Sequence, residues 1–181
     1  MNFRYDIIVV GGGHAGCEAA FIAATMGART LLVTMDMTKF AQMSCNPAMG
    51  GIAKGQIIRE IDALGGMSGI ITDRTMIQFR MLNRAKGPAV WSPRAQADKK
   101  RYHIRMLRVL EEQAGLDILE AEVEKLVVEG GSVRGIGVSG GGFIKAKRVI
   151  LGLGTFPNGL RHIGETKIHG GRGGDPPSCR V

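Results

Sequence analysis

The stretch Asp6-Ile7-Ile8-Val9-Val10-Gly11-Gly12-Gly13-His14-Ala15-Gly16 decides the fold of this chain. Its apolar run at residues 7–10 predicts a buried strand of a parallel sheet, because helices cover both faces of such strands. Glycines then follow with the spacing G-x-G-x-x-G, at positions 11, 13 and 16. A helix that packs closely on a sheet needs small residues, and these come next: Ala15, Ala19, Ala20, Ala23 and Ala24.

This strand, glycine loop and helix together predict a dinucleotide-binding site. Gly11 permits the tight turn, Gly13 lets a pyrophosphate approach the backbone, and Gly16 lets helix and strand come close. The helix start at Gly12, His14 and Ala15 offers free N–H groups and a positive dipole end to phosphates. A merely glycine-rich turn is the alternative, but the motif lies between a strand and a helix, as dinucleotide binding requires.

The composition is that of a globular protein. The chain has 181 residues, of which 44% are hydrophobic, enough for one domain with a full core. No stretch approaches the ~20 apolar residues of a membrane span, so we expect no membrane partner. Cys17, Cys45 and Cys179 are widely spaced without a metal-binding pattern, which predicts no metal site. Together with the lack of a signal-peptide pattern, this cysteine usage predicts a cytoplasmic protein.

The positive charge is concentrated in one segment. The chain carries a net charge of +8, and residues 74–108 alone hold ten Lys or Arg and a single acid, Asp98. Such a segment predicts a polyanionic partner, although a solvated helix face is the common alternative. Aromatic residues in the segment, Trp91 and Phe79, could stack on an unpaired base, but core packing is the commoner outcome. The candidate phosphate contacts are Lys86, Arg94, Lys99, Lys100, Arg101 and Arg105.

Apolar periodicity predicts an α/β fold of the Rossmann-like, two-dinucleotide flavoprotein type. The expected helices are residues 14–26, 57–64 and 94–113. We expect strands at residues 30–34, 117–119, 123–128, 133–138, 143–144 and 149–154. A small β-meander is expected at residues 117–145, and Phe79, Met81 and Leu82 are candidates for the core. The glycine-rich tail at residues 159–181 does not close a domain by itself.

The second strand lacks the acid that usually holds the adenosine ribose. Thr34 ends this strand, and Asp36 follows two residues later, where strand alternation would not favour a ribose contact. This departure weakens a generic NAD dehydrogenase interpretation. The next loop, residues 42–55, is too elaborate for a simple connection, which favours a functional role.

With these residues in place, the chain resembles the bacterial flavoprotein family that modifies the tRNA wobble uridine, known as MnmG or GidA. The loop at residues 42–55 (QMSCNPAMGGIAKG) and the pair at residues 86–90 (KGPAV) and 94–98 (RAQAD) are the most specific matches. Further matches lie at residues 11–16, 62–66, 78–83, 154–156, 162–164 and 170–178.

The resemblance implies an FAD enzyme that acts with the GTPase MnmE. The family adds a carboxymethylaminomethyl or aminomethyl group to carbon 5 of the wobble uridine, with NADH as reductant. FAD contacts would then fall on residues 11–16, on Val123 and on Ser178, and Thr34 matches the family's usual residue at the ribose position. Family members are homodimers and much longer, so residues 1–181 are expected to be the N-terminal portion of the FAD-binding domain.

Cys45 is the candidate catalytic residue. Carbon 5 of uracil is a poor nucleophile, and a thiolate that adds to carbon 6 makes carbon 5 nucleophilic. A nearby positive charge such as Lys54 would favour the thiolate. The alternative role for Cys45 is that of a packed structural cysteine. The alternative functions for the chain are a related folate-dependent tRNA uridine methyltransferase, or a nucleotide-binding module or fragment without chemistry. Cys17, among alanines, is predicted to be buried packing.

Overall fold

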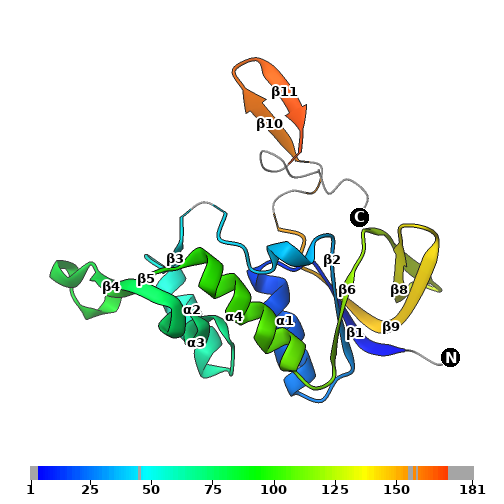
Figure 1. Ribbon diagram of the computed structural model, residues 1–181, viewed down its shortest axis with the longest axis horizontal. Coiled ribbons are helices and arrows are strands. Elements are labelled where there is room, and N and C mark those ends of the chain that lie inside the picture. Colours follow the sequence, from blue (N-terminus) through cyan, green and yellow to red (C-terminus); the bar gives the residue numbers. More distant parts are fainter. Residues whose placement is uncertain (1–3, 45, 155–156, 158, 171–181) are drawn as a thin grey trace.

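A parallel sheet forms the centre of the molecule (Figure 1). The structure is a computed structural model that describes residues 4–44, 46–154, 157 and 159–170. β1 (Tyr5–Val10) lies between β2 (Thr30–Thr34) and β9 (Gly142–Leu151), and β6 (Leu116–Glu120) lies beyond β2. All neighbouring pairs in this part of the sheet are parallel, as the apolar run at residues 7–10 predicts.

β9 joins the parallel sheet to an antiparallel meander. Its first half pairs with β8 (Ser132–Val138), which pairs with β7 (Val123–Glu129), and its second half pairs with β1. The prediction of two separate strands here is wrong, because residues 145–148 lack an apolar run and still continue the strand. The predicted start of the meander at residue 117 is also wrong, because β6 belongs to the parallel sheet.

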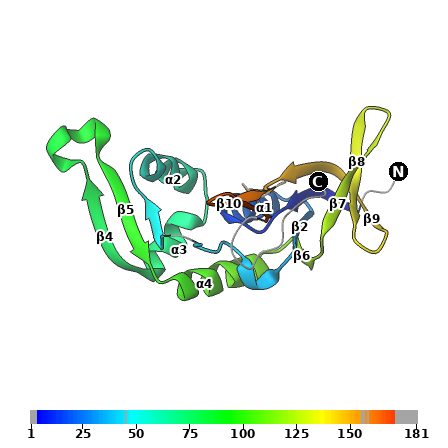
Figure 2. The ribbon, with the colours of Figure 1, turned by 90° about the horizontal axis from the view of Figure 1, so that it is seen from above.

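Two helices cover one face of the parallel sheet. α1 (His14–Thr25) buries its small residues there, and α4 (Lys99–Glu112) packs beside it (Figure 2). Val9 of β1 faces this helical layer, whereas Ile8 and Val10 face a second core shared with β7 and β8. This alternation along one strand is why both faces of β1 are buried, as the continuous apolar run requires.

A second, smaller sheet lies beside the helices (Figure 2). Its order is β3 (Ala48–Gly50), β5 (Ser92–Ala97), β4 (Met76–Leu82), all antiparallel. The helices α2 (Lys54–Ala63) and α3 (Ser68–Thr75) pack against it. Glu18 of α1 ties this unit to the main layer, because its carboxylate accepts hydrogen bonds from the N–H groups of Met67 (2.9 Å) and Ser68 (2.6 Å) at the start of α3.

The predicted helix at residues 94–113 is too long at its beginning. Residues 94–97 belong to β5, and α4 starts at Lys99 after Asp98, whose side chain accepts hydrogen bonds from the N–H groups of Lys100 and Arg101, each at 3.0 Å. The cap fixes the start, because an aspartate at this position satisfies otherwise unpaired N–H groups. Phe79 is 53% exposed on β4, so its assignment to the core is wrong, whereas Met81 and Leu82 are half-buried.

Three short 3-10 turns and a hairpin complete the described part of the chain. The turns are η1 (Met37–Lys39), η2 (Arg84–Lys86) and η3 (Pro88–Val90). The hairpin of β10 (Leu160–Ile163) and β11 (Thr166–His169) stands away from both sheets (Figure 1).

Candidate dinucleotide-binding site

The carboxyl ends of the parallel strands meet at one edge of the sheet. The N–H of Gly11 donates to the carbonyl of Val33, and the N–H of Gly152 donates to the carbonyl of Val10, both at 2.8 Å. The chain runs from β1 outward to β2 and β6, then returns to the other side of β1 as β9. Such a reversal of strand order is where open α/β sheets bind their ligands.

The three motif glycines differ in what surrounds them. A side chain on Gly16 would collide with the carbonyl oxygen of Gly11, and one on Gly11, at φ +109°, would collide with the carbonyl of Gly152. Gly13 has ordinary backbone angles, and a Cβ built on it meets nothing within 4 Å. Two of the glycines therefore allow close packing, whereas the third faces open space.

The start of α1 is suited to an anion. Gly13 is the N-cap and supplies no side-chain hydrogen bond, so the first-turn N–H groups of His14, Ala15 and Gly16 have no partner within the helix. The helix dipole adds positive potential at the same place. A phosphate group beside Gly13 would find both contributions together.

The end of β2 packs on the glycine loop. The Thr34 side chain is buried, and a Cβ on Gly12 would lie 2.9 Å from its Oγ1 and 2.7 Å from the ring of Phe40. The carbonyl of Thr34 accepts a hydrogen bond from the N–H of Ala121 at 2.8 Å, two residues before Val123. The structure thus brings Gly12, Thr34 and the start of β7 to one edge of the sheet.

Asp36 is engaged within its own turn. Its carboxylate accepts hydrogen bonds from the N–H (2.9 Å) and hydroxyl (2.5 Å) of Thr38 and pairs with Lys39 at 2.8 Å. The hydrogen bond from Lys39 first, and then those from Thr38, lower the pKa of Asp36 to about 2. These contacts complete the η1 turn and leave Thr34 as the polar side chain at the end of β2.

The chain after β2 returns over the glycine loop. The N–H of Ala41 donates to the carbonyl of Gly12 at 2.8 Å, and Phe40, Ala41 and Met43 are buried. The carbonyl of Phe40 lies 2.8 Å from Nδ1 of His103 on α4. The loop at residues 42–55 therefore begins at the glycine loop, but Cys45 itself lies outside the described residues, as does Ser178.

His14 is a titratable side chain within the glycine loop. Its Nε2 is buried without a hydrogen-bond partner among the described residues, and its ring centroid lies 5.7 Å from that of Tyr102. Desolvation, and then the charge of Lys54, lower the pKa of His14 below its ordinary value of 6.5, against a smaller opposing effect of Glu18. The neutral imidazole is therefore the form that the fold favours.

The buried His14 predicts a loss of stability in mild acid. Below a pH of about 6.5 the unfolded chain binds a proton at His14 that the folded chain resists, so stability falls as pH falls through this region. We expect the melting temperature of His14→Gln to fall less between pH 7.5 and 5.5 than that of the native chain. Thermal melts at both pH values measure this, and an equal fall in the two proteins would contradict the assignment.

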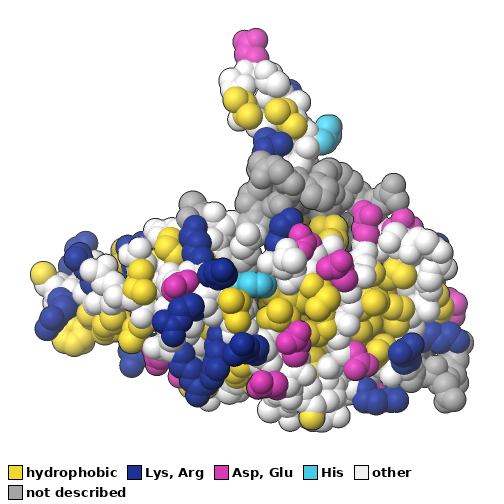
Figure 3. All heavy atoms as spheres, viewed as in Figure 1, with side chains coloured by type: hydrophobic (Ala, Val, Ile, Leu, Met, Phe, Trp, Pro, Cys, Tyr) yellow, Lys and Arg dark blue, Asp and Glu magenta, His cyan; other side chains and the backbone are white. Residues whose placement is uncertain are grey.

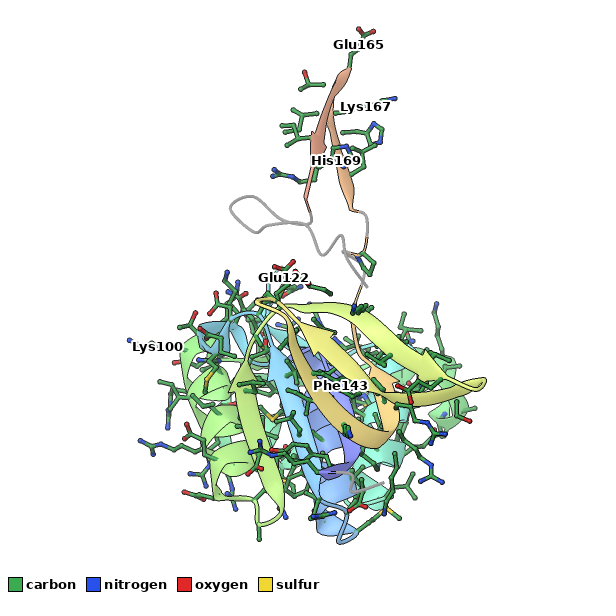
Figure 4. The ribbon with its side chains drawn as sticks, turned by 90° about the vertical axis from the view of Figure 1, so that its right-hand side faces the viewer. Lys100, Glu122, Phe143, Glu165, Lys167 and His169 are labelled. Carbon is green, nitrogen blue, oxygen red and sulfur yellow. The ribbon has the colours of Figure 1, made fainter. Side chains whose placement is uncertain are left out.

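Two predicted residues turn out to be buried. Val123 packs in the second core, so a ligand would meet its main chain, next to Glu122 at the same edge (Figure 4).

Cys17 is buried with its Sγ 3.4 Å from the carbonyl of Gly12, and burial raises its pKa to about 12. Cys17 is therefore packing, as predicted, and its thiol supports the glycine loop.

The predicted phosphate contacts are spread over two regions (Figure 3). Lys86 lies in η2 and Arg94 in β5, whereas the other four lie on α4. Trp91 (41% exposed) and Phe79 lie at the surface of the β4–β5 hairpin, and Nε1 of Trp91 donates to the carbonyl of Arg84 at 3.2 Å. Arg74 and Arg108 lie at the same pocket as Arg101 and Arg105 but are not among the predicted phosphate contacts. The spacing of residues 101, 105 and 108 indicates that they share one face of α4.

The described residues contain neither a membrane-spanning helix nor a cluster of metal ligands. None of the described helices is long and apolar enough to cross a membrane. Over the same part of the chain, no group of three or more His, Cys, Asp or Glu side chains could hold a metal ion.

Comparison with known proteins gives close matches. The family model described as "Glucose inhibited division protein A" matches residues 6–181. The tRNA uridine 5-carboxymethylaminomethyl modification enzyme MnmG of Phocaeicola vulgatus is 57% identical over all 181 residues, which cover 29% of that protein. Aquifex aeolicus GidA has a TM-score of 0.91 and 52% identity, over 96% of this chain and 29% of that one.

A more distant match shows the fold alone. The GidA-related protein of Thermus thermophilus has a TM-score of 0.67 at 20% identity, over 96% of this chain and 63% of that one. The chain spans about 29% of the length of curated relatives such as the Phocaeicola vulgatus protein.

Proposed function

This chain belongs to the glucose inhibited division protein A family, and on that premise we propose that it is the FAD-binding part of a tRNA-modifying flavoenzyme. Residues 1–181 would form the N-terminal portion of the FAD-binding domain. The observation that carries the proposal is the glycine loop, where Gly11 and Gly16 pack tightly while Gly13 opens to the carboxyl edge of the sheet.

The residues at this edge fit FAD. The first-turn N–H groups of His14, Ala15 and Gly16 would hold the pyrophosphate, and Thr34, at the end of β2, would lie at the ribose. Val123 would contribute its main chain, and Ser178 remains a predicted contact. When bound, FAD would supply the redox chemistry of the modification, while the neutral His14 beside it adds no positive charge.

The whole protein would act on the wobble uridine of tRNA. We propose that it adds a carboxymethylaminomethyl or aminomethyl group to carbon 5. The name of its relatives describes the carboxymethylaminomethyl modification. NADH as reductant, the GTPase MnmE as partner, homodimerisation and a cytoplasmic location are further parts of this proposal. The family match argues against the related folate-dependent methyltransferase, and the module without chemistry remains the competing function for this chain alone.

Cys45 is the proposed catalytic thiol. Its loop starts at the hydrogen bond from Ala41 to Gly12, and Lys54, at the start of α2, lies close enough to lower the pKa of His14. This supports a thiol near the cofactor with positive charge nearby. In the full-length enzyme, Cys45→Ser is expected to lower the tRNA modification rate by about 100-fold or more, whereas FAD binding is unchanged. Activity that survives in Cys45→Ser would contradict the role.

The visible absorption spectrum of the purified chain tests the cofactor proposal. A flavin spectrum, with FAD identified after release, is the expected result, or binding of added FAD if the protein is colourless. A chain that is folded by circular dichroism but binds no added FAD would contradict the proposal that these residues suffice to hold it.

A further inference from the structure

A pocket of about 260 Å³ lies between the end of α3 and the solvent-facing side of α4. Four of its six lining residues are arginines. Three come from α4 at the spacing i, i+4, i+7, and the fourth is in the last turn of α3. The lining residues are Arg74, Thr75, Arg101, Ile104, Arg105 and Arg108.

The fold explains why these arginines converge. Asp98 caps α4 and sets where the helix begins, while Tyr102, Met106 and Leu110 are buried on the opposite side. Positions three and four apart share a helix face, so anchoring the apolar side turns residues 101, 105 and 108 together toward α3. α3 contacts α4, which places Arg74 at the same pocket.

The pocket has positive charge without compensation. No Asp or Glu lines it, and within the described ranges no ion pair joins a carboxylate to any of these four arginines. The Nε of Arg105 is buried and has no hydrogen-bond partner there. Buried N–H donors are nearly always satisfied. The unsatisfied Nε of Arg105, in a pocket lined by three further arginines, therefore indicates a place for an anion.

We propose that this arginine pocket binds a backbone phosphate of the tRNA substrate, an inference that rests on the proposed function. Guanidinium groups present planar, paired donors that match phosphate oxygens. A pocket of about 260 Å³ lined by guanidinium groups has room for a phosphate group of the tRNA backbone. Lys100, the neighbour of Arg101 in α4, points away from the body of the molecule (Figure 4).

Binding of fluorescently labelled tRNA to the chain tests the pocket. We expect Arg105→Gln/Arg108→Gln to weaken tRNA binding at least tenfold at about 50 mM salt, and to reduce the slope of log K against log salt by about 1 to 2. The control Lys125→Gln/Lys145→Gln removes the same charge from exposed positions on the β-meander and should change the affinity less than threefold. An equal loss in both double variants would overturn the proposal in favour of unspecific attraction.

Two further measurements define the ligand. The variant Arg101→Lys/Arg105→Lys/Arg108→Lys keeps the charge but loses the paired donors, and is expected to weaken tRNA binding severalfold. Inorganic phosphate, at constant ionic strength, should compete with tRNA on the native chain and not on the glutamine variant. If phosphate binds in the pocket but tRNA affinity is the same in native and glutamine proteins, the site serves a free phosphate and the proposal is overturned.

FAD binding, followed in the same samples, separates this proposal from the proposed function. None of the residues that line the arginine pocket belongs to the glycine loop, so all variants should bind FAD as the native chain does. A native chain that binds FAD but no tRNA would overturn the pocket and leave the flavin site standing. Loss of FAD binding in the native chain would count against the proposed function instead.

Discussion

Gly13→Ala is expected to weaken FAD binding at least tenfold while leaving the melting temperature within about 2 °C of the native value. Gly13 has backbone angles that alanine adopts freely, and the added methyl group meets no protein atom within 4 Å. The same methyl group would occupy the space through which a pyrophosphate reaches the backbone. Flavin fluorescence titration and thermal melts measure the two effects separately.

Gly16→Ala is the matched control, and its effect should fall on the fold. A Cβ at this position would collide with the carbonyl oxygen of Gly11, a main-chain atom that cannot move without displacing the strand. Overpacking of this kind costs on the order of 1–3 kcal/mol, a fall in melting temperature of about 2–4 °C for each kcal/mol. If both variants lost stability equally, or if Gly13→Ala bound FAD normally, the division of roles within the loop would be wrong.

Phe40→Ala is expected to destabilise the chain by about 3–5 kcal/mol, the usual cost of removing a fully buried aromatic ring. Phe40 is 0% exposed, its ring lies against Gly12, and its carbonyl is held by His103. The lost ring leaves a cavity directly behind the glycine loop. Urea denaturation at neutral pH measures the free energy of unfolding.

Phe79→Ala is the control for that measurement. Phe79 is half-exposed on β4, so its truncation should cost less than 1 kcal/mol. Phe40→Ala should also weaken FAD binding, because its ring packs against Gly12 of the glycine loop. A Phe40→Ala protein as stable as Phe79→Ala would mean that residues 35–44 do not pack as the structure shows.

The sequence alone determined the elements with strong periodicity. The apolar run at residues 7–10, the glycine spacing and the alanines of α1 predicted a strand, a turn and a helix, and the structure has all three. These signals are local, because each rests on the side chains of one short segment. The resemblance of residues 42–55 and 86–98 to a known family was likewise readable without coordinates, and the family match confirms it.

Weak periodicity predicts the wrong element at two places. Residues 94–97 are predicted as part of the helix that becomes α4, because no apolar signal separates them from it. The Asp98 cap and the pairing of β5 with β3 and β4 distinguish the strand. Residues 145–148 contain no apolar run, so the sequence predicts two short strands where the structure has the single strand β9. A strand with one solvent-facing side needs no such run.

The tertiary structure alone decided which residues share a site. It placed Phe40 behind Gly12, brought the start of β7 to the end of β2, and brought Arg74 to the three arginines of α4. None of these contacts has a signature in sequence spacing across elements. The reason is physical: a hydrogen bond or a pocket depends on distances between side chains, and only the packing of helices and strands sets those distances.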